Sequence, residues 1–109
     1  MKGKIVLVPF PFTDLTAAKL RPALVLYEGK RDVVLAFISS RISTQPSEAD
    51  VLLESAHEGF EKSGLKVDSM IKLDKLATVL KALIVGDLGE LDEETREEVN
   101  RKLESLLKI

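Results

Sequence analysis

An arginine and two serines lie next to two apolar segments, and together they could bind a phosphate group. Arg21 precedes Pro22 at the start of one apolar run, and Ser39 and Ser40 follow another. Proline restricts the residue before it to an extended backbone, so the Arg21 guanidinium would project from a defined point. If the two runs pair as a hairpin, Arg21 lies beside residues 37–39, and a guanidinium next to hydroxyls suits a phosphate. An exposed arginine and an unrelated serine-rich turn would explain the same pattern.

The composition excludes several other kinds of site. The sequence has no cysteine and one histidine, His57. A disulfide framework, a thiolate metal site and a cysteine nucleophile are therefore excluded. There is no glycine-rich phosphate loop, no His-Glu-x-x-His pair and no Gly-x-Ser-x-Gly elbow. His57 lies in a polar, glycine-containing stretch, which is typical of a solvated side chain. We expect neither a metal ion nor a cofactor.

The 109 residues suit one domain over residues 1–109, with 45% apolar and 31% charged side chains. No apolar run approaches the roughly 20 residues needed to cross a bilayer. The first residues show no signal-peptide pattern. We expect a cytoplasmic protein with no membrane contact.

Charge is distributed unevenly along the chain. Residues 1–45 hold seven Lys/Arg against three Asp/Glu, whereas residues 46–109 hold nine against fifteen. The N-terminal part is therefore the candidate surface for a polyanion such as a nucleic acid. A random excess of basic residues would give the same numbers.

The N-terminal half predicts three strands, over residues 5–8, 23–27 and 33–38. Pro9 should end the first strand, because proline cannot donate to a sheet ladder. The second and third strands should form a hairpin with a loop over residues 28–32. Both are apolar on both faces, which favours a small barrel or a sheet covered on each side.

The middle of the chain is less regular. Residues 39–47 form a hydroxyl-rich loop that is long enough to suggest function. A short strand is expected over residues 50–54, and one helical turn over residues 58–64, because its final glycine favours the left-handed cap conformation. Residues 69–85 fit either a helix or a strand, since apolar side chains match both spacings.

The C-terminal segment predicts an amphipathic helix. Asp92 stands at an N-cap position, and Glu93 and Glu94 follow in the first turn. An apolar stripe follows, which consists of Val99, Leu103, Leu106 and Leu107. This helix should cover the sheet, although the same stripe could seat a partner helix.

Several sequence blocks resemble one known family. Residues 3–16 (GKIVLVPFPFTDLT) and 19–26 (KLRPALVL) resemble the N-terminal signature of the MazF/PemK-like toxins. Residues 36–40 (AFISS), 63–71 (SGLKVDSMI) and 89–91 (GEL) are similar to later blocks of that family, in the same order. The resemblance therefore spans nearly the whole chain.

The resemblance implies a fold and a function. The fold would be mainly β, a small SH3-like β-barrel with a C-terminal helix, in which residues 69–79 form a strand. The protein would be a homodimer and the toxin of a type II toxin–antitoxin system. Its activity would be metal-independent, sequence-selective cleavage of single-stranded RNA, and a cognate antitoxin protein would inhibit it.

The resemblance also assigns roles by position. Arg21 matches the catalytic arginine of the family's Arg-Pro motif, and Ser39 falls where many members place a catalytic threonine. Residues 68–69 lie where members contact RNA or the partner subunit. The residues that we expect to bind the substrate are Thr16, Lys19, Ser40, Arg41 and Ser69. Without metal ligands, a ribonuclease can use the 2′-hydroxyl of the RNA as nucleophile, so Arg21 would stabilise the phosphorane and Ser39 would bond to an oxygen.

The sequence also departs from the family pattern. Ala77 stands where many members carry arginine, and Leu80 where members often carry aspartate. The loop over residues 13–20 is shorter than in several members, so the recognised RNA sequence does not carry over. Two alternatives keep the same fold: a toxin that binds and inhibits a protein such as DNA gyrase, and a decayed toxin that binds only antitoxin.

Overall fold

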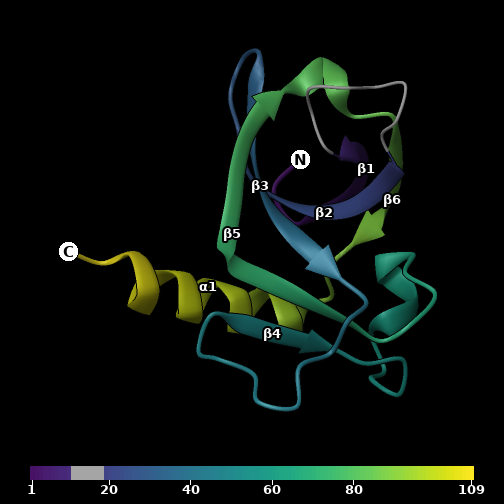
Figure 1. Ribbon diagram of the computed structural model, residues 1–109, viewed down its shortest axis with the longest axis vertical. Coiled ribbons are helices and arrows are strands. Elements are labelled where there is room, and N and C mark those ends of the chain that lie inside the picture. Colours follow the sequence, from purple (N-terminus) through teal and green to yellow (C-terminus); the bar gives the residue numbers. More distant parts are fainter. Residues whose placement is uncertain (11–18) are drawn as a thin grey trace.

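The computed structural model describes residues 1–10 and 19–109. Within these residues one antiparallel sheet holds six strands in the order β4-β5-β3-β2-β1-β6 (Figure 1). In chain order the elements are β1 (Lys4–Phe10), β2 (Lys19–Glu28), β3 (Asp32–Ser39), β4 (Asp50–Leu53), η1 (Phe60–Ser63), β5 (Ser69–Leu80), η2 (Lys81–Leu83), β6 (Gly86–Glu90) and α1 (Glu93–Leu107). The sheet curls into a half-barrel, and α1 packs against its outside. This arrangement confirms the mainly β fold with a C-terminal helix.

The hairpin predicted for the N-terminal half is formed by β2 and β3. Val25 lies opposite Leu35, and Ala23 lies opposite Phe37. The loop is shorter than expected, because the strands extend to Glu28 and Asp32. Within the turn the Gly29 N–H donates to the Asp32 carbonyl at 2.8 Å.

Strand β1 continues through Pro9, which the sequence had placed at the strand's end. Pro9 lies opposite Leu20 of β2. On its other side β1 pairs with β6 only as far as Leu7. Proline is tolerated there because the missing N–H removes no bond to a second neighbouring strand.

Residues 69–79 are extended, as the family resemblance implied, and the helical spacing in this segment is misleading. In β3, Ala36 faces Leu76, but the next residue, Phe37, faces Lys72. Residues 73–75 of β5 therefore have no partner in β3. The strand bends at this irregularity (Figure 1), and its two halves follow different directions.

Short elements close the middle of the chain. β4 confirms the strand expected near residue 50, and η1 confirms the single helical turn. Gly64 ends that turn with φ of 74°, in the left-handed region. A Cβ at this position would collide with the Leu88 carbonyl of β6, so both the backbone angle and the close approach require glycine.

The sheet buries apolar side chains on both faces, as expected from the doubly apolar strands. The first cluster lies between the sheet, η1 and α1; its members include Ile5, Leu24, Ala36, Ile38, Val51, Leu53, Phe60, Ile71, Leu73, Leu91 and Val99. The second lies inside the curl and consists of Val6, Val8, Ala23, Val25, Val33, Leu35 and Val79. One chain therefore covers both faces of its own central strands.

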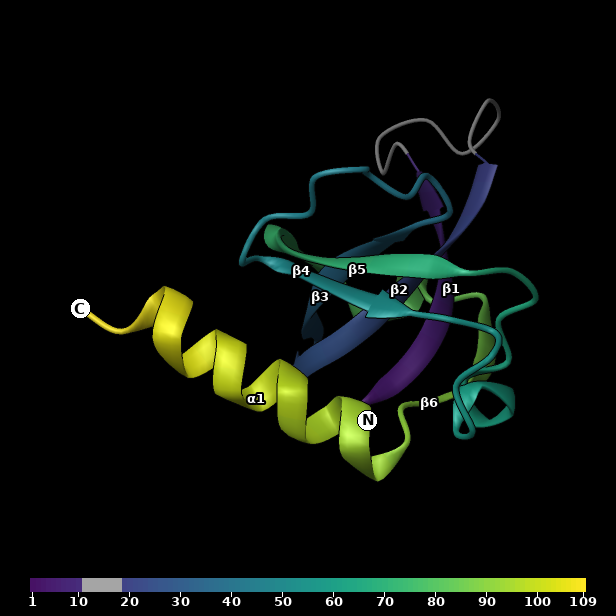
Figure 2. The ribbon, with the colours of Figure 1, turned by 90° about the horizontal axis from the view of Figure 1, so that it is seen from below.

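Helix α1 begins at the predicted N-cap, where the Asp92 side chain accepts from the Thr95 N–H at 3.4 Å. Val99 is buried, and Leu103 and Leu106 pack against the first cluster. Leu107, expected in the same stripe, is 59% exposed, because the end of α1 extends past the strands (Figure 2). No helix in the described part of the chain is long and apolar enough to cross a membrane.

Candidate functional site

Arg21 and Ser39 lie on the same face of the hairpin, at the same end. Side chains alternate along a strand, so Arg21 shares a face with Ala23 of the second cluster. Phe37 is opposite Ala23, and Ser39 lies two residues further along that face. Continuing this register places Ser39 beside Arg21. The structure therefore brings together the two groups that the sequence proposed as a phosphate site.

Two phenylalanine rings flank this position. Phe10 of β1 and Phe37 of β3 meet edge to face, with ring centroids 5.4 Å apart and planes at 74°. Strand β2 lies between β1 and β3, so the rings meet across the strand that carries Arg21. Phe10 is 45% exposed. No local sequence pattern indicates this pair, since only the sheet order makes the two residues neighbours.

The polar groups at this end are available to an anion. Ser39 is half-buried, and its hydroxyl oxygen accepts from the Arg41 N–H at 3.1 Å, which leaves its O–H able to donate. Lys19, Arg21, Ser40 and Arg41 are exposed. None of the three cations among them forms an ion pair with another described residue. An incoming anion would therefore not have to displace a described carboxylate from them.

A lysine of β5, Lys72, lies on the same face. Lys72 of β5 is opposite Phe37 of β3 on one side and Asp50 of β4 on the other. Its Nζ is 2.6 Å from Asp50 Oδ1, so the two side chains form an ion pair. Nothing in the local sequence indicates this pair, because its partners are 22 residues apart and meet only through the register of β4 and β5.

Asp50 is held on several sides. Its side chain is 3% exposed, and Oδ2 accepts from the Ser47 N–H at 2.9 Å. Its backbone carbonyl accepts from Lys102 Nζ of α1 at 2.7 Å. Burial by itself would raise the pKa of Asp50, but the Lys72 ammonium and the Ser47 groups outweigh it and lower the pKa. Asp50 is therefore a buried carboxylate that stays ionised.

Of the expected substrate-binding residues, Ser69 is already hydrogen-bonded within the fold. Ser69 is buried, and its hydroxyl donates to the Val67 carbonyl at 2.9 Å, so the group is already bonded within its own loop. The Ser69 oxygen can still accept a hydrogen bond, but its O–H is not free to donate to a phosphate. Thr16 lies outside the described residues.

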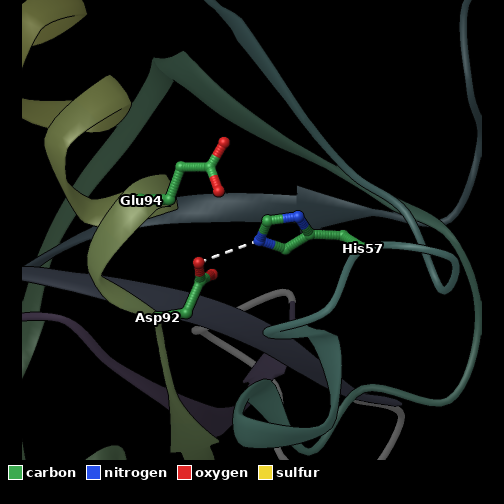
Figure 3. Close-up of side chains that lie close together, drawn as sticks. All are labelled: His57, Asp92 and Glu94. Atoms are coloured by element: carbon green, nitrogen blue, oxygen red, sulfur yellow. Dashed lines mark hydrogen bonds and ion pairs between the residues drawn. The ribbon is translucent and has the colours of Figure 1, made fainter.

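His57 is not the solvated side chain that its sequence context predicts. Its Nε2 lies 2.8 Å from Asp92 Oδ2, and Glu94 is close by (Figure 3). One donor atom from each of these residues lies within 4.8 Å of the others, a spacing that could hold a divalent cation. Asp92 Oδ2 also accepts from the Thr95 N–H at the helix N-cap. The histidine therefore ties the segment after β4 to the start of α1.

The sequence matches the family model described as PemK-like, MazF-like toxin of type II toxin-antitoxin system over residues 1–107. No curated protein matches the chain in sequence.

Solved structures share its fold at low sequence identity. An endoribonuclease in complex with its cognate antitoxin, from a mycobacterial species, is 16% identical with a TM-score of 0.74, covering 100% of this chain and 95% of that one. The Mycobacterium tuberculosis toxin MazF-mt6 is 15% identical with a TM-score of 0.73, covering 97% of each chain. A MazE-MazF structure from Deinococcus radiodurans is 24% identical with a TM-score of 0.72, covering 99% and 95%.

The His57–Asp92 pair should make stability depend on pH. The hydrogen bond to Asp92 raises the pKa of His57 above its ordinary 6.5. A raised pKa means that the folded state binds the proton more tightly than the unfolded state does. The contribution of protonated His57 to stability is therefore complete below about pH 6, and it is lost as the pH rises through the pKa of His57 in the folded state. The melting temperature of the native protein relative to His57→Gln should therefore fall between pH 6 and 8. A difference in melting temperature between the two proteins that stays constant from pH 6 to pH 8 would contradict the pairing.

Proposed function

The chain belongs to the family of PemK-like, MazF-like toxins of type II toxin-antitoxin systems, and we propose that it is an endoribonuclease that cleaves single-stranded RNA without a metal ion. The observation that carries the proposal is Arg21, which forms no ion pair with another described residue, on the same face and at the same end of the hairpin as Ser39 and flanked by two aromatic rings. Bases of a single strand can stack on exposed rings while cations hold the phosphates. The similarity in fold to endoribonucleases supports the same activity.

The residues present favour chemistry in which the RNA supplies the nucleophile. The 2′ oxygen attacks the adjacent phosphorus as it loses its proton, and the bond from phosphorus to the 5′ oxygen breaks as that oxygen gains one. The products are a 2′,3′-cyclic phosphate and a 5′-hydroxyl. Among the described residues on this face the one carboxylate, Asp50, is paired with Lys72, so no cluster of acidic groups is available for a catalytic cation.

Arg21 and Ser39 divide the work in this mechanism. The guanidinium can donate two parallel hydrogen bonds to the non-bridging phosphate oxygens, whose negative charge grows in the transition state. The Ser39 hydroxyl can donate a third while its oxygen still accepts from the Arg41 N–H. The extended backbone before Pro22 fixes the point on β2 from which the Arg21 side chain projects.

Replacing Arg21 should slow cleavage strongly. Arg21→Ala removes a preorganised stabiliser of the phosphorane, a change that typically costs about 10²–10³ in rate. Ser39→Ala should cost less, and Ser39→Thr should be nearly neutral, because the hydroxyl stays and its rotamer is stiffer. His57→Ala, far from this face, is the control. Rates come from single-turnover cleavage of a long single-stranded RNA in EDTA.

The substrate serves as a second control on the mechanism. RNA with a 2′-methoxy group at the cut site, and DNA, should both resist. Loss of activity in EDTA, or full activity of a folded Arg21→Ala protein, would overturn the mechanism. Toxicity that persists without Arg21 would instead favour a toxin that inhibits a protein target.

We further propose that the antitoxin is an acidic or amphipathic segment that covers the face with Arg21. Complexes of a similar fold with antitoxin support such a partner. The segment and RNA would compete for the same cations. Saturating antitoxin should therefore release a fluorescent RNA, measured by anisotropy. RNA binding that stays unchanged at saturation would refute a shared site.

We also propose a homodimer, as the family resemblance implies. The outer face near the hairpin turn exposes Tyr27, Leu76 and Leu80, which the register of β2, β3 and β5 places together. Such side chains favour a second copy.

Sedimentation at micromolar concentration should give the mass of two chains. Leu80→Lys should shift the protein toward one chain without loss of folding, because this side chain is 56% exposed. A native protein that sediments as one chain would contradict the proposal.

A further inference from the structure

The Asp50–Lys72 ion pair lies at the edge of the face that carries Arg21 and Ser39, and neither residue takes part in the proposed cleavage step. The face crosses the sheet in a fixed order: Arg21 on β2, Phe37 and Ser39 on β3, and Lys72 on β5. Neighbouring strands are about 4.8 Å apart, and Lys72 is offset from Arg21 by two residues along the strands, so the two residues are separated by roughly 12 Å at the backbone. The residues between them are an aromatic ring and a hydroxyl rather than a carboxylate.

We propose that Lys72 forms a second phosphate subsite, which binds a backbone phosphate of the RNA next to the one held by Arg21 and Ser39. This inference rests on the proposed function. A single strand carries one phosphate per nucleotide, so a strand that runs from β2 across β3 brings a neighbouring phosphate toward β5. Phe37, which lies directly opposite Lys72, offers a ring on the path between the two cations.

The carboxylate of Asp50 does not prevent this role. Its side chain is almost fully buried, while that of Lys72 is 26% exposed, so the ammonium is the charge that faces solvent. Both carboxylate oxygens are engaged, Oδ1 by Lys72 and Oδ2 by the Ser47 N–H. The ammonium has three donors, so a phosphate can take one that Asp50 does not use.

Asp50 instead acts as the positioning residue of this subsite. A free lysine side chain has many rotamers, and ordering it on binding costs affinity. The contact with Asp50 limits this freedom before RNA arrives. Asp50 is itself held by the loop before β4, through Ser47, and by α1, through Lys102. The subsite is therefore anchored both to this loop and to α1.

A purely structural ion pair between β4 and β5 is the competing explanation, and the salt dependence of RNA binding separates the two. Lys72→Met alone would leave a buried, unpaired carboxylate, which could unfold the protein. The comparison is therefore made between Asp50→Asn and the double variant Asp50→Asn/Lys72→Met. Both lack the buried charge, and they differ only at residue 72. The probe is a fluorescent single-stranded RNA with 2′-methoxy groups, which binds without being cleaved.

The logarithm of the association constant falls linearly with the logarithm of the salt concentration. Removing the lysine should make this slope shallower by about 0.7, the value for one phosphate contact on a single strand. At about 0.1 M salt this corresponds to roughly fivefold weaker binding. Lys72→Arg in the native background should keep the slope. The matched control is Lys81→Met: Lys81 is also paired with a carboxylate, Glu28 at 2.9 Å, and is similarly exposed, but it lies beyond the far end of β5. It should leave the slope unchanged.

Equal slopes for the two Asp50→Asn proteins would overturn the subsite while leaving the proposed function intact. If neither the native protein nor any variant binds the probe in a salt-dependent way, the proposed function fails instead. Should the Asp50→Asn proteins not fold, the native protein still decides the question. Adding the probe should shift the NMR signals of the Lys72 side chain, and signals that stay in place at saturation would overturn the subsite.

Discussion

Strands β2 and β3 bury side chains on both faces, and this requirement shapes the rest of the molecule. Leu24 and Ala36 face one core, while Val25 and Leu35 face the other. In the described part of the chain a single α-helix is available, and it covers the first face. The second face is covered by the sheet itself, which curls until β1 and the far half of β5 close over it. A sheet that buries apolar side chains on both faces removes more apolar area from water than a flat sheet with one solvent-exposed face, and it is therefore more stable.

The same curl explains where the candidate site lies. Apolar side chains occupy the inner face up to Ala23 and Leu35, and the side chains beyond them on the same strands are Arg21, Phe37 and Ser39. Core and site are thus successive stretches of one face. The buried core next to the site fixes the backbone positions of the strands that carry these residues. The bend in β5 brings Lys72 onto the same face.

Asp50 connects this site to the rest of the fold. A buried carboxylate is costly unless it is paired and hydrogen-bonded, and Asp50 meets this condition through Lys72 and the Ser47 N–H. The backbone carbonyl of the same residue accepts from Lys102 of α1. The helix that covers the outer face is therefore tied to the strand next to the site. Replacing Asp50 would remove side-chain contacts with the loop before β4 and with β5, and it would disturb the backbone contact with α1.

Much of the fold follows from the sequence, because its determinants are local. The β2–β3 hairpin, the Asp92 cap and the turn at Gly64 depend on residues a few positions apart, so turn chemistry and backbone angles were enough to predict them. The apolar pattern of both hairpin strands also predicted a sheet covered on each side. Arg21 and Ser39 came together as expected, since the hairpin register decides their distance.

Other features depended on contacts between residues far apart in the chain. The apolar spacing of residues 69–85 suits helix and strand equally, and pairing of β5 with β3 and β4 decided between them. Leu107 is exposed because the C-terminal end of α1 extends beyond the sheet. The apolar spacing of the helix does not indicate where the sheet ends. The His57–Asp92 and Asp50–Lys72 pairs and the contact of Phe10 with Phe37 arise only once strand order and register are set. Local preference determined the elements, whereas the burial of both sheet faces determined which of their side chains meet.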